Sequence, residues 1–418
     1  MHSKMKDNTI LHVDQNAFYA SVEMLKNPSL RRVPCAVAGD PVNRHGIVLA
    51  KNQQAKDAGV KTGEALWEAR QKCPDLVFVP PDYPSYLYYS RLARELYHEY
   101  TDRVEAFGID ECWLDLEGCP EEDGTVIAEI LRERMKKEFG LTVSVGVSWN
   151  KIYAKLGSDL KKPDAVTVIT QGNYQQVVYP LPVDKLLYVG RATYRKLRRI
   201  GVRTIAELVA LGPDFLRELF GVVGLSLYAF AAGLDTSEVE KAGRAVPIKS
   251  VGNSITTRHD LYTAEDIKAV TYMLSESVAS RLRDAGMAAR TVQISMRDYQ
   301  LNNFERQTPL DLPTQLCSEI APAAFSLIMQ NFKEGQWIRS LGVRACKLVD
   351  ASKLKQVSFL PDEKRRAAVL RLEDTMDTLR SRYGGLSVRR GISLVDSSLT
   401  GHDIKSENVI HPIGFFGP

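Results

Sequence analysis

Three acidic residues could act together on a substrate that carries phosphate, although they lie far apart in the sequence. Asp110 and Glu111 are adjacent, and Asp14 comes much earlier in the chain. Carboxylates that are brought close together repel one another and favour protonation unless a cation compensates them. A ligand set made only of oxygen, completed by substrate phosphates, suits Mg²⁺ better than zinc, which prefers Cys or His. The first hypothesis is therefore phosphoryl or nucleotidyl transfer at a magnesium site.

The composition narrows the class of protein. With 418 residues the chain is long for a single core and suggests about two to four domains. The formal net charge of +4 is too small to identify a polyanionic partner. We find no apolar run long enough for a bilayer and no signal-peptide pattern, which predicts a cytoplasmic protein without membrane contact. The six cysteines form no CxxC pair and argue for reduced thiols rather than structural zinc.

The acid at position 14 is predicted to close a strand. Apolar residues over 9–14 indicate that strand, and Asn16 could cap a helix over 17–26. A carboxylate at the end of a strand, beside a helix N-terminus, is well placed in a site that binds anions and metal ions. Residues 28–80 are broken by prolines and glycines into short pieces, which indicates a small inserted lobe.

The acidic pair lies between two more predicted strands, 104–109 and 111–116. Neighbouring residues of a strand point to opposite faces, so Asp110 and Glu111 could serve one site only where the pleat is broken. Gly108 offers such a break.

Helices with packed faces are expected over 84–100, which is rich in tyrosine, and over 125–139, followed by a strand over 141–147. Without the inserted lobe the order is β-α-β-β-α-β, which is typical of a ferredoxin-like unit. That order places both acidic segments on neighbouring central strands.

The second half of the chain carries basic helices and a second sheet module. A helix over 150–160 leads to Lys162, which suggests a triphosphate site, although these lysines could also form a solvated face. The segment 185–203 is basic throughout and resembles a helix-hairpin-helix that binds a phosphate backbone; a solvated helix is the alternative. Beyond a polar tether, residues 250–347 repeat the order β-α-β-β-α-β. This repeat lacks a carboxylate cluster, which favours a binding role over a catalytic role. The strands of this repeat carry five arginines, at positions 290, 297, 306, 339 and 344.

The end of the chain is predicted to contain one long helix. It covers 362–383, with Ala368, Leu372, Met376 and Leu379 on a single apolar face. Residues 397–418 are expected to be frayed.

Three signatures together resemble the Y-family of DNA polymerases, the lesion-bypass enzymes. The first is His12-Val13-Asp14 with residues 17–23, the second is Ile109-Asp110-Glu111, and the third runs from Ser144 to Pro163. The resemblance covers about residues 8–350. It implies an α+β multidomain fold with a ferredoxin-like palm, a small fingers insertion, a helix-hairpin-helix thumb and a second α+β domain, the little finger. The implied bounds are 1–26 and 83–174 for the palm, 27–82 for the fingers, 175–238 for the thumb, 239–249 for a linker, 250–350 for the little finger, which would bind DNA, and 351–418 for a tail.

The resemblance also implies roles for the residues of the first two signatures. Asp14 and Asp110 would bridge two Mg²⁺ ions, and Glu111 would hold the ion nearer the primer terminus. The main-chain carbonyl of Gln15 would complete the other ion. Tyr19 would be the steric gate that excludes a ribose 2′-hydroxyl. Without the family, Tyr19 would be interpreted as a core aromatic residue.

Contacts to the incoming deoxynucleotide follow from the same resemblance, with departures. Lys162 would neutralise the β and γ phosphates. Gln53 and Lys56 stand where many members carry Tyr and Arg, so one loses the aromatic face and the other keeps only a point charge. Position 108 is Gly where Ser is common, and Ala192 replaces a second glycine in the thumb turn. The pattern over 52–63 favours the UmuC-type branch over the DinB type.

Gln356-Val357-Ser358-Phe359-Leu360 resembles the pentapeptide that binds the bacterial sliding clamp. The alternative for this segment is a buried start to the tail helix. The implied partners are primer-template DNA, deoxynucleoside triphosphates and the clamp. The protein would be a monomer in the cytoplasm, associated with the nucleoid.

The leading interpretation is a low-fidelity, template-directed DNA polymerase that extends primers past damaged bases in the SOS response and DNA repair. Small fingers imply an open site that discriminates weakly between correct and incorrect pairs. A nucleotide cyclase would use the same palm but would need neither the basic thumb nor the second sheet. A catalytically silent DNA-binding accessory protein would never extend a primer.

Overall fold

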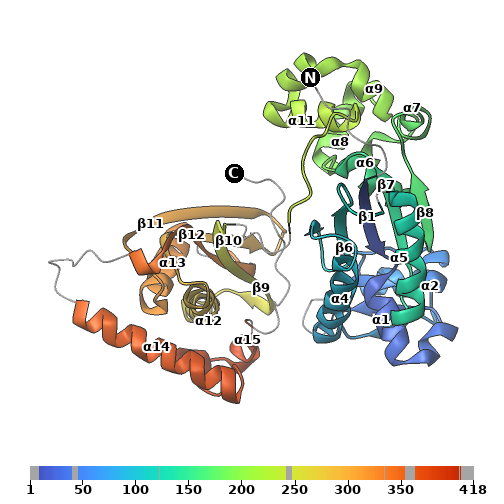
Figure 1. Ribbon diagram of the computed structural model, residues 1–418. Coiled ribbons are helices and arrows are strands. Elements are labelled where there is room, and N and C mark those ends of the chain that lie inside the picture. Colours follow the sequence, from blue (N-terminus) through green and yellow to red (C-terminus); the bar gives the residue numbers. More distant parts are fainter. Residues whose placement is uncertain are drawn as a thin grey trace. The chain divides into compact units, whose positions relative to one another are not determined.

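The computed structural model describes residues 9–39, 46–121, 123–241, 247–333, 335–353, 363–403 and 405. The described chain forms two compact units, one made of residues 9–39 and 47–241 and one that begins at residue 247 (Figure 1). No described helix combines the length and the hydropathy that are needed to cross a bilayer.

The first unit is built on a five-stranded sheet with the order β5-β6-β1-β7-β8. The strands are β1 Ile10–Gln15, β5 Val104–Ala106, β6 Glu111–Asp115, β7 Val143–Ser148 and β8 Ala165–Val168. Strand β1 pairs antiparallel with both β6 and β7, and β8 adds to β7 in parallel. The predicted ferredoxin-like order, with the two acidic segments on neighbouring central strands, is confirmed.

Alternation along β7 explains which helix covers which face of this sheet. Val143, Val145 and Val147 point into the core formed with α4 (Tyr83–His98) and α5 (Gly124–Phe139). Gly146 faces α6 (Lys151–Leu160), where a Cβ would lie 1.9 Å from the carbonyl oxygen of Ala154. The missing side chain therefore lets α6 pack directly against the central strands.

An inserted lobe follows α1 (Phe18–Lys26) and the 3-10 turn η1 (Pro28–Arg32). Its sheet has the order β3-β2-β4, and its small core is separate from that of the five-stranded sheet. The Asn52 side chain accepts from the N–H of Ala55 in α2 and from the N–H of Cys35, which joins the start of β2 to the start of α2. The elements of the lobe are β2 Cys35–Ala38, β3 Val48–Lys51, α2 Gln53–Asp57, α3 Leu66–Lys72 and β4 Val77–Val79.

Short helices complete the first unit. The predicted turn at Gly190 caps α8, and the predicted turn at Gly201, which has a positive φ of 88°, ends it before α9. The basic helix between two turns is therefore confirmed. These elements are α7 Tyr174–Val177, η2 Val183–Lys185, α8 Arg191–Arg199, α9 Ile205–Ala210, α10 Gly212–Phe220 and α11 Val222–Ala231.

The second unit has a four-stranded antiparallel sheet with the order β11-β10-β12-β9. Its elements are β9 Ser250–Leu261, α12 Ala264–Asp284, β10 Met287–Asp298, β11 Asn303–Thr314, α13 Cys317–Asn331 and β12 Ile338–Asp350, followed by the turn η3 Ala351–Lys353. Helices α12 and α13 lie on one face of the sheet, and the other face carries no described helix (Figure 1). The predicted β-α-β-β-α-β order is confirmed.

The tail helix α14 (Glu363–Tyr383) packs mainly through charged side chains rather than through its predicted apolar face. Leu372 is 59% exposed and Leu379 is also exposed, whereas Glu373 is 1% exposed. The Glu373 carboxylate accepts from the guanidinium of Arg283 at 2.7 Å and from the N–H of Cys317 at 3.0 Å. The surface that α14 meets therefore offers ionic partners to the helix.

The prediction that the chain frays from residue 397 was wrong for the residues described there. Leu399 and Thr400 are buried in α15 (Ser397–Thr400), which follows the turn η4 (Gly391–Leu394). The hydroxyl of Thr400 donates to the carbonyl of Ser393 at 2.6 Å, which holds the segment closed.

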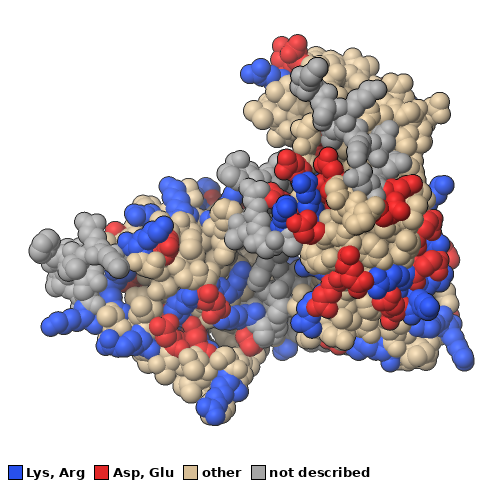
Figure 2. Space-filling view, in the orientation of Figure 1, with Lys and Arg blue, Asp and Glu red and all other residues tan. Residues whose placement is uncertain are grey.

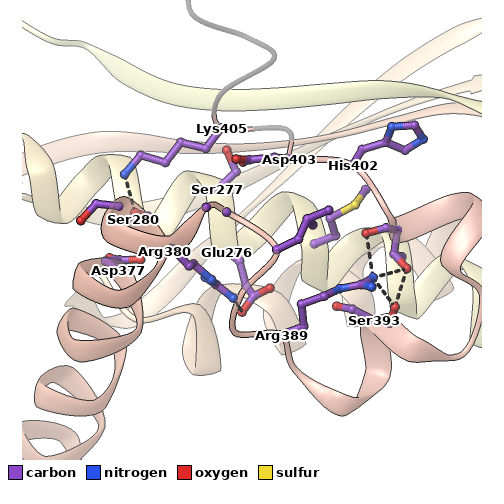
Figure 3. A pocket seen from close by; sticks show the side chains of 16 residues that line it. Glu276, Ser277, Ser280, Asp377, Arg380, Arg389, Ser393, His402, Asp403 and Lys405 are labelled. Atoms are coloured by element: carbon purple, nitrogen blue, oxygen red, sulfur yellow. Dashed lines mark hydrogen bonds and ion pairs between the residues drawn. The ribbon is translucent and has the colours of Figure 1, made fainter.

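A cavity of about 430 Å³ lies between α12, α14 and the segment that follows α14 (Figure 3). The guanidinium of Arg380 reaches the carboxylate of Glu276 at 3.0 Å, and the ammonium of Lys405 reaches the hydroxyl of Ser280 at 2.7 Å. These bonds join the tail to α12, so the cavity belongs to the interface that docks the tail.

Candidate active site

Asp14 and Glu111 lie directly opposite each other on adjacent antiparallel strands. Leu11 and Val13 face the core on the α5 side, so alternation turns Asp14 to the face that carries α6. Cys112 places Glu111 on that same face by the same argument. Two of the three predicted acids are thus brought together by strand register alone.

Asp110 lies outside both strands, in the bend that joins β5 to β6. Its carbonyl accepts from the N–H of Gln15 at 3.1 Å, which holds the bend against the end of β1. The break that the sequence predicts near Gly108 is therefore present, and consecutive acids can contribute to one site.

Two lysines from the α6 region neutralise the acids. The Lys155 ammonium lies 3.2 Å from Asp14 Oδ2 and 3.1 Å from Glu111 Oε2. Lys162 reaches the same oxygen of Asp14 at 2.7 Å and Asp159 at 2.9 Å. Lys155 and Asp159 were not among the predicted site residues, although both stand in the third signature.

The charges of this cluster move the carboxyl pKa values in opposite directions. Burial, together with the charges of Glu111 and Asp14, raises the pKa of Asp110 to about 7. Burial works in the same direction on Glu111, but the hydrogen bond with His12 and the Lys155 charge prevail and lower its pKa to about 2. Among the three acids, Asp110 is therefore the one whose negative charge is least compensated by positive groups.

His12 is a third residue that sequence reasoning did not assign to the site. Its ring is fully buried, with Nδ1 2.9 Å from the Ser158 hydroxyl and Nε2 3.4 Å from Glu111 Oε2. Burial lowers the pKa of His12. Its position two residues before Asp14, on the same face of β1, is the signal that could have identified it.

Asn16 does not cap α1, contrary to the prediction. The capping residue is Ala17, whose left-handed φ of 47° starts the helix without a side-chain bond. The Asn16 amide donates to the Ser144 hydroxyl at 2.9 Å, and its carbonyl accepts from the N–H of Asp164 at 2.8 Å. Asn16 therefore connects β1 to β7 and to the segment that follows Lys162.

Tyr19 is half-buried and stacks on Tyr86, with ring centroids 4.3 Å apart and planes 13° apart. Burial, with a smaller effect from Tyr83, raises the pKa of the Tyr19 phenol to about 12. Tyr86 is itself buried and its hydroxyl donates to Glu23 at 2.7 Å, so the Tyr19 ring has a fixed support.

The two predicted nucleotide contacts of the inserted lobe lie on α2. Gln53 and Lys56 are exposed, and the Gln53 amide donates to Asp57 at 2.6 Å. The structure brings neither of these side chains into contact with the three acids.

The donor set of this site suits a hard divalent cation, because three of the four predicted ligands are carboxylates and the fourth is the main-chain carbonyl of Gln15. Among the described residues, no three His, Cys, Asp or Glu side chains are arranged as a metal cage. Lys155 and Lys162 neutralise two of the acids, while the raised pKa of Asp110 shows negative charge that remains uncompensated. The residues therefore fit a divalent ion that would compensate the remaining negative charge.

Comparison with known proteins agrees with this geometry. The model of the impB/mucB/samB family matches residues 13–159, and the model of its C-terminal domain matches residues 248–359. The chain is 49% identical to DNA polymerase IV of Acetivibrio thermocellus, over 93% of this chain and 98% of that one. It is 34% identical to DNA polymerase IV 1 of Bacillus subtilis, over 93% and 94%. A solved Y-family DNA polymerase chimera, Dbh-Dpo4(243-245)-Dbh, shares the fold with a TM-score of 0.70 and 23% identity, over 81% of this chain and 99% of that chain.

The chain belongs to the Y-family of DNA polymerases. It is therefore a DNA-directed DNA polymerase of the lesion-bypass class, and neither a nucleotide cyclase nor a silent accessory protein. Family membership implies a DNA substrate and a need for divalent metal. The preference for the UmuC-type branch is not decided by these matches and stays a prediction.

Proposed function

We propose that this polymerase joins deoxynucleotides to a primer at a site formed by Asp14, Asp110 and Glu111, with the Gln15 carbonyl. The observation that carries the proposal is the register of β1 against β6, which places two acids side by side and the third in the adjoining bend. Two Mg²⁺ ions bound there would supply Lewis acidity for the attacking 3′-oxygen and for the leaving pyrophosphate.

The residues of the chain that surround the acids have separate tasks in this proposal. A bound cation would replace Lys162 beside Asp14 and leave the ammonium for the β and γ phosphates. Lys155 is more deeply buried and would stay with Glu111 as a permanent counter-charge. His12 would keep the Glu111 carboxylate turned toward the site. Gln53 and Lys56 remain predicted nucleotide contacts.

The helix-free face of the second unit is proposed to bind the DNA backbone. Arg297 and Arg344 are exposed on its strands, and the hydroxyls of Thr256 and Ser340 lie 2.7 Å apart, with Ser340 paired opposite Arg297. Figure 2 shows Lys and Arg interspersed with acids on the visible face of the molecule. The proposal for the helix-free face depends on the exposed arginines and hydroxyls of its strands. We also propose the bounds of the palm, fingers, thumb and little finger that the family resemblance implies.

Primer extension on undamaged and lesion-bearing templates tests the function. Each deoxynucleotide is offered alone, with Mg²⁺ and without it. We expect template-directed addition that needs the metal, frequent incorporation opposite non-complementary bases, and extension past a damaged base. Metal-independent addition, or addition that ignores the template, would contradict the proposal.

Tyr19 is predicted to select the sugar of the incoming nucleotide. We expect Tyr19→Ala to raise ribonucleotide incorporation by about 10- to 100-fold relative to deoxynucleotide, because removing the ring opens space for a 2′-hydroxyl. Tyr19→Phe keeps the ring on Tyr86 and should keep the selectivity. Single-nucleotide kinetics with matched ribo- and deoxynucleotides measure the ratio. An unchanged ratio in Tyr19→Ala would show that Tyr19 does not select the sugar.

A sliding clamp remains the predicted protein partner. Its proposed contact, Gln356–Leu360, lies outside the described residues. Greater processivity in primer extension when the clamp is added, and its loss with Phe359→Ala, would support the partner. The monomeric state and the nucleoid association also remain predictions.

A further inference from the structure

Three aromatic side chains gather at one end of the second unit's sheet. Tyr262 is 61% exposed and Trp337 is 52% exposed, and their ring centroids lie 6.1 Å apart. Tyr299 is also exposed, and its N–H donates to the carbonyl of Trp337 at 3.2 Å. We call Tyr262, Tyr299 and Trp337 the aromatic step.

Strand pairing places the step at one end of the sheet. Leu261, the last residue of β9, pairs with Ile338, the first residue of β12, and both are fully buried against the helices. Tyr262 follows Leu261 and Trp337 precedes Ile338, so both residues lie just beyond the ends of these two strands. The two exposed rings therefore border the sheet that carries the exposed arginines.

The strands beside the step carry polar side chains. Arg297 pairs with Ser340, and Ser340 pairs with Thr256, so one guanidinium and two hydroxyls cross the face next to the rings. The next rung contains Gly342, where a Cβ would lie 2.3 Å from the Ser295 hydroxyl. Donors for phosphate oxygens thus lie beside flat apolar surfaces.

We propose that the aromatic step binds unpaired bases of DNA, such as those of a single-stranded template beyond the duplex. Aromatic rings stack on any base and therefore tolerate sequence, while adjacent cationic and hydroxyl groups contact the backbone. This inference deepens the proposed function and rests on the proposal that the helix-free face binds DNA.

The composition of the step favours nucleic acid over a protein partner. A protein interface of ordinary size needs roughly 800 Å² on each side with an apolar centre, whereas this patch consists of a few rings beside a polar strip. A base needs only one ring face and a nearby donor, and the step offers both.

Binding of labelled DNA tests the assignment without any chemistry. Two primer-template duplexes are compared by fluorescence anisotropy, one blunt and one with a template overhang of about ten thymidines. We expect Trp337→Ala to weaken binding to the overhang DNA by about tenfold and to leave the blunt duplex unchanged, because only unpaired bases stack. Trp337→Phe should restore most of the affinity.

Trp67 provides the matched control, because it is equally exposed but lies in α3 of the first unit. Trp67→Ala should leave both affinities unchanged. Equal losses of affinity on the two duplexes would overturn the proposal. No loss on either duplex would also overturn it and would leave a protein as the candidate partner of the step. Wild-type protein that fails to extend primers yet shows the overhang-specific loss would refute the proposed function alone.

Discussion

Replacing Asp110 and Glu111 together with alanine is expected to slow primer extension by about a thousandfold or more. The two carboxylates would hold the metal ions that stabilise the transferred phosphate, a contribution of several kcal/mol, and about 1.4 kcal/mol corresponds to a factor of ten in rate. Affinity for primer-template DNA should change by less than about twofold, because DNA is proposed to contact other surfaces. Single-turnover extension and anisotropy measure the two quantities separately.

Isosteric substitutions separate lost charge from lost packing in this experiment. Asp110→Asn with Glu111→Gln should be as inactive as the alanine pair, because amides keep the shape but bind divalent cations weakly. Glu129→Ala with Glu133→Ala removes two acids from the exposed side of α5 and should leave the rate unchanged. Substantial extension by the isosteric variant would show that the catalytic acids lie elsewhere.

Replacing Glu373 with alanine is expected to destabilise the second unit by about 3 kcal/mol. The change would leave the largely buried guanidinium of Arg283 with Asp377 as its nearest partner and would uncap the N–H of Cys317. Arg390 would lose its 2.7 Å contact with the same carboxylate. Denaturant unfolding followed through Trp337 fluorescence measures the loss.

Asp374 supplies the control for this prediction, since it lies one residue further along α14 and 3.5 Å from the same guanidinium but is exposed. We expect Asp374→Ala to cost less than about 0.5 kcal/mol, because solvent screens an exposed ion pair. Equal effects of the two substitutions would mean that the buried carboxylate does not hold the tail.

Local signals were sufficient for the elements that carry the acids. Apolar alternation identified β1 and β6, and the glycine at 108 marked the bend that frees Asp110 from the strand. These features depend on neighbouring residues, so they can be found from one sequence. The cap at Asn16 was wrong because the N–H of Asp164, which is distant in the sequence, donates to the side-chain oxygen that a cap would use.

The sequence by itself determined the family and the order of strands and helices, and it indicated three acids as candidates, because periodicity and signature spacing are properties of nearby residues. Only the tertiary structure decided that Lys155 and His12 surround the carboxylates and that α14 turns its charged face inward. A buried charged side chain is stable only where a partner of opposite charge lies beside it. That partner comes from another part of the chain, so its position depends on how the elements pack.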